Sequence, residues 1–116
     1  MKALFVLNDP PYGTERSYNG LRLAISLSKN EENQIFVFLL GDGVICSKRG
    51  QKVPQGYYNI EVMLRNIFRS SGTVGSCGTC MDARGIAENE LIEGVEKSTL
   101  AQLTEWSMAA DKVFVF

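Results

Sequence analysis

Histidine is absent from the 116-residue sequence, and its absence removes several classes of catalysis at once. Ser-His-Asp triads, HExxH zinc sites and histidine-ligated haem all need an imidazole ring. Any chemistry must therefore come from cysteine, carboxylate, lysine, arginine or tyrosine side chains, or from a bound cofactor. No motif in the chain points to a resident cofactor, and we expect none.

Long hydrophobic runs are also absent. The longest are Ala3 to Leu7, Ile35 to Leu40 and Val113 to Phe116, whereas a membrane-spanning helix needs about 20 apolar residues. The first residues, Met1 to Phe5, lack the long apolar region and the small-residue cleavage site of a signal peptide. We therefore expect a cytoplasmic protein without a membrane partner.

An excess of either sign of charge is absent as well. Lysine and arginine number 12, aspartate and glutamate number 13, and the net charge is −1. The basic residues cluster only at Lys48-Arg49 and Lys52, so we expect no direct nucleic-acid partner. A near-zero net charge gives little self-repulsion and favours association between copies.

Cysteine occurs three times, at Cys46, Cys77 and Cys80. An odd, low number without a leader sequence points to a reducing compartment rather than to a disulfide framework. Three thiols without histidine cannot complete a tetrahedral zinc site within one chain, so we expect no metal. Taken alone, Cys46 is expected to be a structural, buried residue.

The remaining composition is that of a globular domain, with 45% hydrophobic and 22% charged residues. Residues 1–116 are expected to form one domain. The pattern of apolar segments predicts strands at Lys2–Asn8, Gln34–Leu40, Thr73–Cys77, Glu93–Lys97 and Lys112–Phe116. The first two strands read as buried on both faces, as in a parallel sheet. The predicted core includes Leu4, Val6, Ile35, Val37, Leu39, Val113 and Val115.

Helices are predicted between these strands. Thr14 or Ser17 can cap the first, Asn59 the second, and Thr99 the third, where Gln102 completes a capping box. Alternating strands and helices predict an α/β fold with an open, mostly parallel sheet and helices on both faces.

In such folds ligands bind at the carboxyl ends of the strands. Three loops leave those ends here: Asp9 to Gly13, Gly41 to Cys46, and Cys77 to Gly85. We expect these three loops to carry the functional site.

The third of these loops begins with Cys77-Gly78-Thr79-Cys80. Two thiols at this spacing can share a disulfide, and free backbone N–H groups in the turn stabilise a thiolate. Arg84 adds positive charge nearby, Gly78 lets a substrate approach, and Thr79 is either a hydrogen-bond donor or a turn-forming residue. Asp82 opposes the effect of Arg84. The competing interpretation is a pair of small buried residues without chemistry.

The segment from Cys77 to Ile86, CGTCMDARGI, resembles the cysteine loop of the DsrE/DsrF-like superfamily, most closely its YchN-like branch. The segments Asn8 to Glu15, Arg49 to Lys52 with Gly56-Tyr57, and Trp106 to Val113 resemble the same branch, so the likeness covers essentially the whole chain. The resemblance implies a five-stranded α/β sheet and assembly into homotrimers or homohexamers.

The better-understood members of that superfamily relay sulfur, and the resemblance places Cys77 at their persulfide-carrying cysteine. It implies a sulfur-relay protein with donor and acceptor proteins as partners. Cys80 is a second thiol that the relay proteins lack, and it could resolve a persulfide into a disulfide. Arg84, Gly78 and Thr79 would bind the transferred group.

Two other functions stay open. One is a thiol–disulfide oxidoreductase, since the motif also resembles the CxxC of thioredoxin-like proteins. The other is a non-catalytic module for small-molecule binding or assembly, in which Tyr12 would form a pocket wall. The loop around Tyr12 lacks GxGxxG and Walker A patterns.

Overall fold

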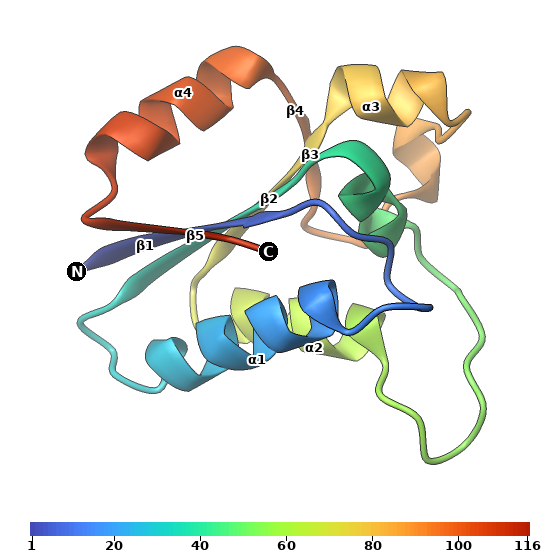
Figure 1. Ribbon diagram of the computed structural model, residues 1–116, viewed down its shortest axis with the longest axis horizontal. Coiled ribbons are helices and arrows are strands. Elements are labelled where there is room, and N and C mark those ends of the chain that lie inside the picture. Colours follow the sequence, from blue (N-terminus) through green and yellow to red (C-terminus); the bar gives the residue numbers. More distant parts are fainter.

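Five strands form one sheet in the computed structural model, which describes all 116 residues (Figure 1). They are β1 (Lys2–Leu7), β2 (Gln34–Leu39), β3 (Thr73–Cys77), β4 (Glu96–Ser98) and β5 (Lys112–Val115). Their order across the sheet is β4-β3-β2-β1-β5, and every pairing is parallel. The predicted open parallel sheet is therefore confirmed.

Helices cover both faces of the sheet, as predicted. In Figure 1, α1 (Arg16–Ser28) and α2 (Ile60–Arg69) lie on one side, and α3 (Gly78–Ala83) and α4 (Leu100–Ala109) lie on the other. Two short 3₁₀ helices, η1 (Gly41–Ser47) and η2 (Glu88–Glu90), follow β2 and α3. None of the helices has the length and apolar character needed to cross a membrane.

Two of the three predicted helix caps are confirmed, but the predicted capping box is not formed, because the Gln102 side chain donates to Glu105 instead. Asn59 accepts a hydrogen bond from the N–H of Val62 at 3.2 Å, and Thr99 accepts one from the N–H of Gln102 at 3.1 Å. These bonds satisfy backbone donors that a helix leaves free in its first turn.

The predicted cap of α1 is wrong. Thr14 donates instead to the Asp9 carboxylate at 2.8 Å, and Ser17 donates to the Asp9 carbonyl oxygen at 2.7 Å. The residue before the helix is Glu15, which makes no side-chain cap. The two hydroxyls are used to hold the loop after β1 against the start of α1.

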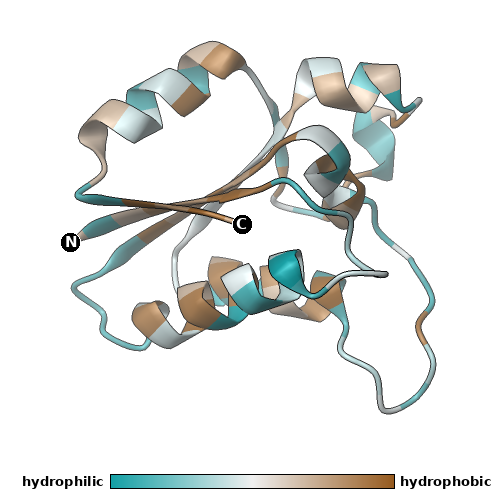
Figure 2. Cartoon of the chain, in the orientation of Figure 1, coloured by the Kyte–Doolittle hydropathy of each residue, from teal (hydrophilic) through white to brown (hydrophobic).

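The strands supply most of the core, and Figure 2 shows their hydrophobic residues between the two helical layers. The predicted core is confirmed at five positions, Leu4, Val6, Ile35, Val37 and Leu39, all of them buried. It is wrong at Val113 and Val115, which are 46% and 67% exposed. The reason is strand order: β5 is an edge strand, and the Trp106 ring of α4 packs instead over Phe36 and Phe38 of β2.

Two further elements differ from expectation. The fourth strand covers Glu96–Ser98 rather than Glu93–Lys97, because Gly94 turns the chain with a φ of +98° and Val95 is buried before pairing begins. The segment after β2 is the 3₁₀ helix η1, not an open loop. It packs directly on the end of β1: a Cβ atom at Gly43 would overlap the carbonyl oxygen of Leu7.

This close approach predicts a strong effect of one methyl group. Gly43→Ala should lower the free energy of unfolding by about 2 kcal/mol or more, because the neighbouring atom is backbone and cannot move aside. Gly75→Ala is the matched comparison, since its Cβ would meet only side chains, Ser98 at 3.2 Å and Trp106 at 3.3 Å. Urea unfolding followed by fluorescence of the single tryptophan measures both. Equal midpoints for the two variants would contradict this packing.

Candidate functional site

The first half of the cysteine motif lies at the junction of a strand and a helix. Cys77 is the last residue of β3 and the cap of α3, which begins at Gly78 without an intervening loop. Side chains alternate along a strand, and a Cβ at Gly75 would face the Trp106 ring of α4. Two residues further on, the Cys77 side chain therefore points to the same face of the sheet, the face of α3 and α4.

An open cavity of about 580 Å³ lies on that face. Its lining comes from residues 77–79, Asp82, Glu88, Lys97 and residues 98–100, so α3, η2, β4 and the start of α4 all contribute. The volume lies within the range of small-molecule sites. Cys77 is only 6% exposed, so a reactant must enter the cavity to reach its sulfur.

Hydrogen-bond donors converge on the Cys77 sulfur. Burial by itself would raise the pKa of the Cys77 thiol, but the Thr79 hydroxyl, the Cys80 thiol and the backbone N–H groups of Thr79 and Cys80 outweigh it. The net pKa lies below the ordinary thiol value. The Thr79 oxygen is 3.2 Å from the sulfur, so this residue, in the first turn of α3, can donate a hydrogen bond to the thiolate.

The second thiol of the motif has the opposite character. Burial raises the pKa of Cys80, and its hydrogen bond to Cys77 raises it further, against the smaller opposing effects of the Gly41 N–H and Arg84. The Gly41 N–H donates to the Cys80 sulfur at 3.3 Å. Cys80 is half-buried and is absent from the cavity lining, and its bond to Gly41 joins it to η1.

Cys46 takes no part in this site. It is 1% exposed, its thiol donates to the Asp9 carbonyl oxygen at 3.6 Å, and burial raises its pKa to about 12. A thiol that stays protonated is a poor nucleophile, so Cys46 is a packing residue. The structure contains no group of three or more cysteine and carboxylate side chains placed to hold a metal ion.

The three loops predicted to carry the site do meet. Cys46 bonds to the first loop at Asp9, and Gly41 bonds to the cysteine loop at Cys80. Arg84 completes the contact: its Nε donates to the Asp42 carboxylate at 2.9 Å, and its Nη1 donates to the Cys80 carbonyl oxygen at 3.0 Å.

Arg84 thus braces α3 against η1 and is not part of the cavity lining. The cation in the cavity is Lys97 of β4, whose Nζ lies 3.1 Å from the Asp82 carboxylate. Sequence reasoning missed Lys97, Glu88 and Thr99 as site residues. Their proximity to Cys77 depends on the pairing of β4 with β3, which no local motif indicates.

Gly78 is required for close packing rather than for flexibility. A Cβ at this position would lie 3.0 Å from Cε of Lys97 and 3.1 Å from the Ser98 carbonyl oxygen. The absence of a side chain lets β4 approach the start of α3, and this approach brings Lys97 to the cavity.

Tyr12 lies elsewhere. Its hydroxyl accepts a hydrogen bond from the Ile60 N–H at 3.2 Å, and its ring packs against Tyr58, with 5.5 Å between ring centroids. It therefore joins the first loop to the start of α2, and it does not line the cavity.

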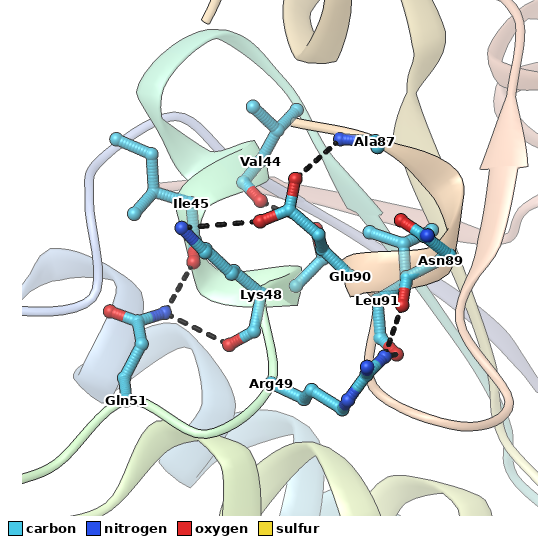
Figure 3. Close-up of polar contacts among 10 residues, drawn as sticks. Val44, Ile45, Lys48, Arg49, Gln51, Ala87, Asn89, Glu90 and Leu91 are labelled. Carbon is cyan, nitrogen blue, oxygen red and sulfur yellow. Dashed lines mark hydrogen bonds and ion pairs between the residues drawn. The ribbon is translucent and has the colours of Figure 1, made fainter. Parts of the chain in front are cut away.

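A cluster of polar contacts holds the segment that follows α3 (Figure 3). Lys48 pairs with Glu90 at 3.3 Å, and Arg49 donates to the carbonyl oxygens of Asn89 and Leu91. Gln51 donates to the carbonyl oxygen of Lys48 at 3.0 Å and fixes the turn from which Arg49 reaches across. These contacts fix η2, which carries Glu88, against the chain that follows η1.

The arrangement predicts that the two thiols of the motif react at different rates. Cys77 should be alkylated by iodoacetamide well below the pH at which Cys80 reacts, and Cys46 should react only after unfolding. Loss of the hydroxyl in Thr79→Val should slow alkylation of Cys77 at neutral pH about three- to tenfold, because a bond to a charged group is lost.

Thr79→Ser keeps the hydroxyl and serves as the control, with a rate close to that of the unmodified chain. Mass spectrometry of the alkylated peptides follows each cysteine separately. Faster labelling of Cys80 than of Cys77 would contradict the assignment of the low pKa.

Comparison with known proteins gives a consistent result. A model of the DsrE/DsrF-like family matches residues 1–116. Protein YchN of Escherichia coli K12 is 45% identical over 116 residues, covering 99% of this chain and 98% of YchN. Uncharacterized protein MK0008 of Methanopyrus kandleri is 37% identical over 111 residues, covering 96% of this chain and 90% of that protein.

Solved structures agree. The crystal structure of the E. coli ychN protein matches with a TM-score of 0.89 at 41% identity, over 100% of this chain and 99% of that one. MTH1491 of Methanobacterium thermoautotrophicum, a protein of unknown function, shares the fold with a TM-score of 0.73 at 16% identity, over 99% and 98% of the two chains. Because the family model spans every residue and close relatives match end to end, the chain belongs to the DsrE/DsrF-like family.

Proposed function

We propose that the protein is a sulfur-relay protein that carries sulfane sulfur as a persulfide on Cys77. The Cys77 thiolate attacks the outer sulfur of a donor persulfide, R–S–SH. A new S–S bond forms on Cys77, the S–S bond of the donor breaks, and its electron pair leaves with R–S⁻. No external oxidant or reductant is needed, because one persulfide replaces another.

The observation that supports this proposal most strongly is the asymmetry of the two thiols. Cys77 lines the cavity and has a lowered pKa, whereas Cys80 is outside the lining and has a raised pKa. Cys80 is the more exposed of the two residues, but only Cys77 combines a lowered pKa with a place in the cavity lining. The sulfur-relay proteins that the chain resembles place their carrier cysteine at the position of Cys77.

Cys80 hydrogen-bonds to the Cys77 sulfur and is therefore placed for the next step, which it takes once its thiol has lost its proton. Its thiolate attacks the inner sulfur of the Cys77 persulfide, a Cys77–Cys80 disulfide forms, and HS⁻ leaves with the electron pair of the broken bond. The two thiols are oxidised and the carried sulfur is reduced to sulfide. Where a partner thiol instead takes the outer sulfur, Cys77 is regenerated directly. The proposal places the protein in the reducing cytoplasm, where its thiols stay available.

The same asymmetry favours one alternative, a thiol–disulfide oxidoreductase. A reactive first cysteine and a less acidic second one also suit disulfide exchange. The reduction potential of the Cys77–Cys80 pair, measured against glutathione buffers, separates the functions when combined with sulfur uptake. Efficient disulfide exchange without sulfur uptake would favour the oxidoreductase.

Sulfur loading should depend on the two cysteines in different ways. After incubation with a persulfide donor, Cys80→Ser should gain about 32 Da, the mass of one sulfur atom, and should keep it longer than the parent. The resolving thiol is absent in this variant, so the persulfide persists. Cys77→Ser should gain no stable sulfur. Intact-mass spectrometry measures both.

Cys46→Ser is the matched control, and it should load and lose sulfur like the parent. Uptake by Cys77→Ser equal to that of the parent would refute the assignment of the carrier. If no form of the protein takes up sulfur from persulfide or inorganic polysulfide, the sulfur-relay function itself is wrong.

We also propose that the protein works as a homotrimer or homohexamer. Apolar side chains outside the cavity are exposed on α4 and β5, at Met108 (83%), Val113 (46%) and Val115 (67%). Large exposed apolar side chains on consecutive elements are typical of surfaces that another protein covers. The family resemblance makes a second copy of this chain the expected occupant.

Light scattering at micromolar concentration should therefore give the mass of a trimer or hexamer. The double variant Met108→Glu, Val115→Lys should shift the protein toward smaller species, because it places charges in the buried contact. A monomeric parent protein would contradict the proposal.

A further inference from the structure

The cavity over Cys77 carries charges of both signs. Lys97 provides an ammonium group, and Asp82 and Glu88 provide two carboxylates. Their sum is −1, and ionisation of Cys77 adds another negative charge. A strongly anionic sulfur donor such as thiosulfate would be repelled from this site.

The three charged groups are open to a ligand. Asp82 and Lys97 form an exposed ion pair, with side chains that are 66% and 36% exposed. Exposed pairs of this kind contribute little to stability, so a ligand charge can replace either partner. Glu88 takes part in none of the five salt bridges of the structure.

From this arrangement we propose that the cavity binds a low-molecular-weight persulfide of an α-amino acid, with cysteine persulfide as the simplest member. Its carboxylate pairs with Lys97, its ammonium group pairs with Glu88, which has no ion-pair partner in the structure, and its outer sulfur faces Cys77. The inference rests on the sulfur-carrier function proposed above and names its donor.

Three features support a small donor. The volume of about 580 Å³ is that of a small-molecule site, and Cys77, one of the lining residues, is only 6% exposed. A zwitterion carries one negative and one positive charge, and the lining has a group of opposite sign for each. Leu100 and the stems of Lys97 and Thr99 supply apolar surface against the carbon chain of the donor.

The reaction balances with this donor. The Cys77 thiolate attacks the outer sulfur of the protonated persulfide, and the S–S bond of the donor breaks. Free cysteine thiolate leaves with the electron pair, while the proton of the persulfide remains on the transferred sulfur. The released amino acid retains both charges, so the contacts with Lys97 and Glu88 orient the donor without taking part in bond breaking.

The test compares three donors that differ only in their charged groups. Cysteine persulfide has both groups, 3-mercaptopropionate persulfide has only the carboxylate, and cysteamine persulfide has only the ammonium group. Each donor is added to the full-length Cys80→Ser protein, and the rate of the about 32 Da gain is followed at low ionic strength.

Lys97→Met should slow loading from the two donors with a carboxylate about three- to fivefold and leave cysteamine persulfide unchanged. Glu88→Gln should slow the two donors with an ammonium group and leave 3-mercaptopropionate persulfide unchanged. Lys112→Met and Glu93→Gln, which change the same residue types outside the cavity, should alter none of the three rates. Added salt should reduce the differences, because the charges are exposed to solvent.

Equal effects of Lys97→Met on all three donors, or no effect on any, would overturn the proposed donor class. So would loading from inorganic polysulfide without loading from cysteine persulfide, although Cys77 would then still be a sulfur carrier. If no donor loads Cys77, the proposed function fails instead, so the two failures can be told apart.

Discussion

The strand β3 passes into helix α3 at Cys77 without an intervening residue, and the chemistry of the site depends on this junction. Strand geometry sets the face on which the Cys77 side chain lies. The first turn of α3 then directs the N–H groups of Thr79 and Cys80 toward the sulfur. A loop at this point would free both the direction of the side chain and the donors that lower its pKa.

The surrounding structure keeps the junction in place. The chain packs closely at two glycines: Gly43 allows η1 to lie on the end of β1, and Gly78 allows β4 to approach α3. The bracing bonds of Arg84 then hold α3 to η1, and the contacts of Arg49 hold the segment after α3. Cys80 thus lies among bonds that join α3 to η1, whereas the cavity beside Cys77 is lined by the exposed ion pair of Lys97 and Asp82.

Sequence reasoning succeeded where local rules decide the structure. The apolar runs located the sheet, Asn59 and Thr99 marked helix starts, and the end of β3 placed Cys77 at the carboxyl edge. It failed where contacts between segments far apart in the sequence decide the structure. Val113 and Val115 read as buried because an apolar strand looks the same at the centre and at the edge of a sheet.

In the candidate site, too, sequence reasoning failed where long-range contacts place the residues. Arg84 was a reasonable anion partner by its distance in sequence, but its guanidinium turns toward Asp42. Lys97 reaches the cavity from 20 residues beyond Cys77 in the sequence, through a strand of only three residues. So short a strand has no periodicity to read, and its register is fixed by pairing with β3.

The central claim is that sulfur arrives first on Cys77, and locating the added sulfur in the unmodified protein tests it most directly. The protein is mixed briefly with a persulfide donor, quenched by alkylation and digested, and each cysteine peptide is read by tandem mass spectrometry. We expect the persulfide on Cys77 at the earliest times, followed by the Cys77–Cys80 disulfide, with Cys46 unchanged. A persulfide that forms first on Cys80 or Cys46 would contradict the claim.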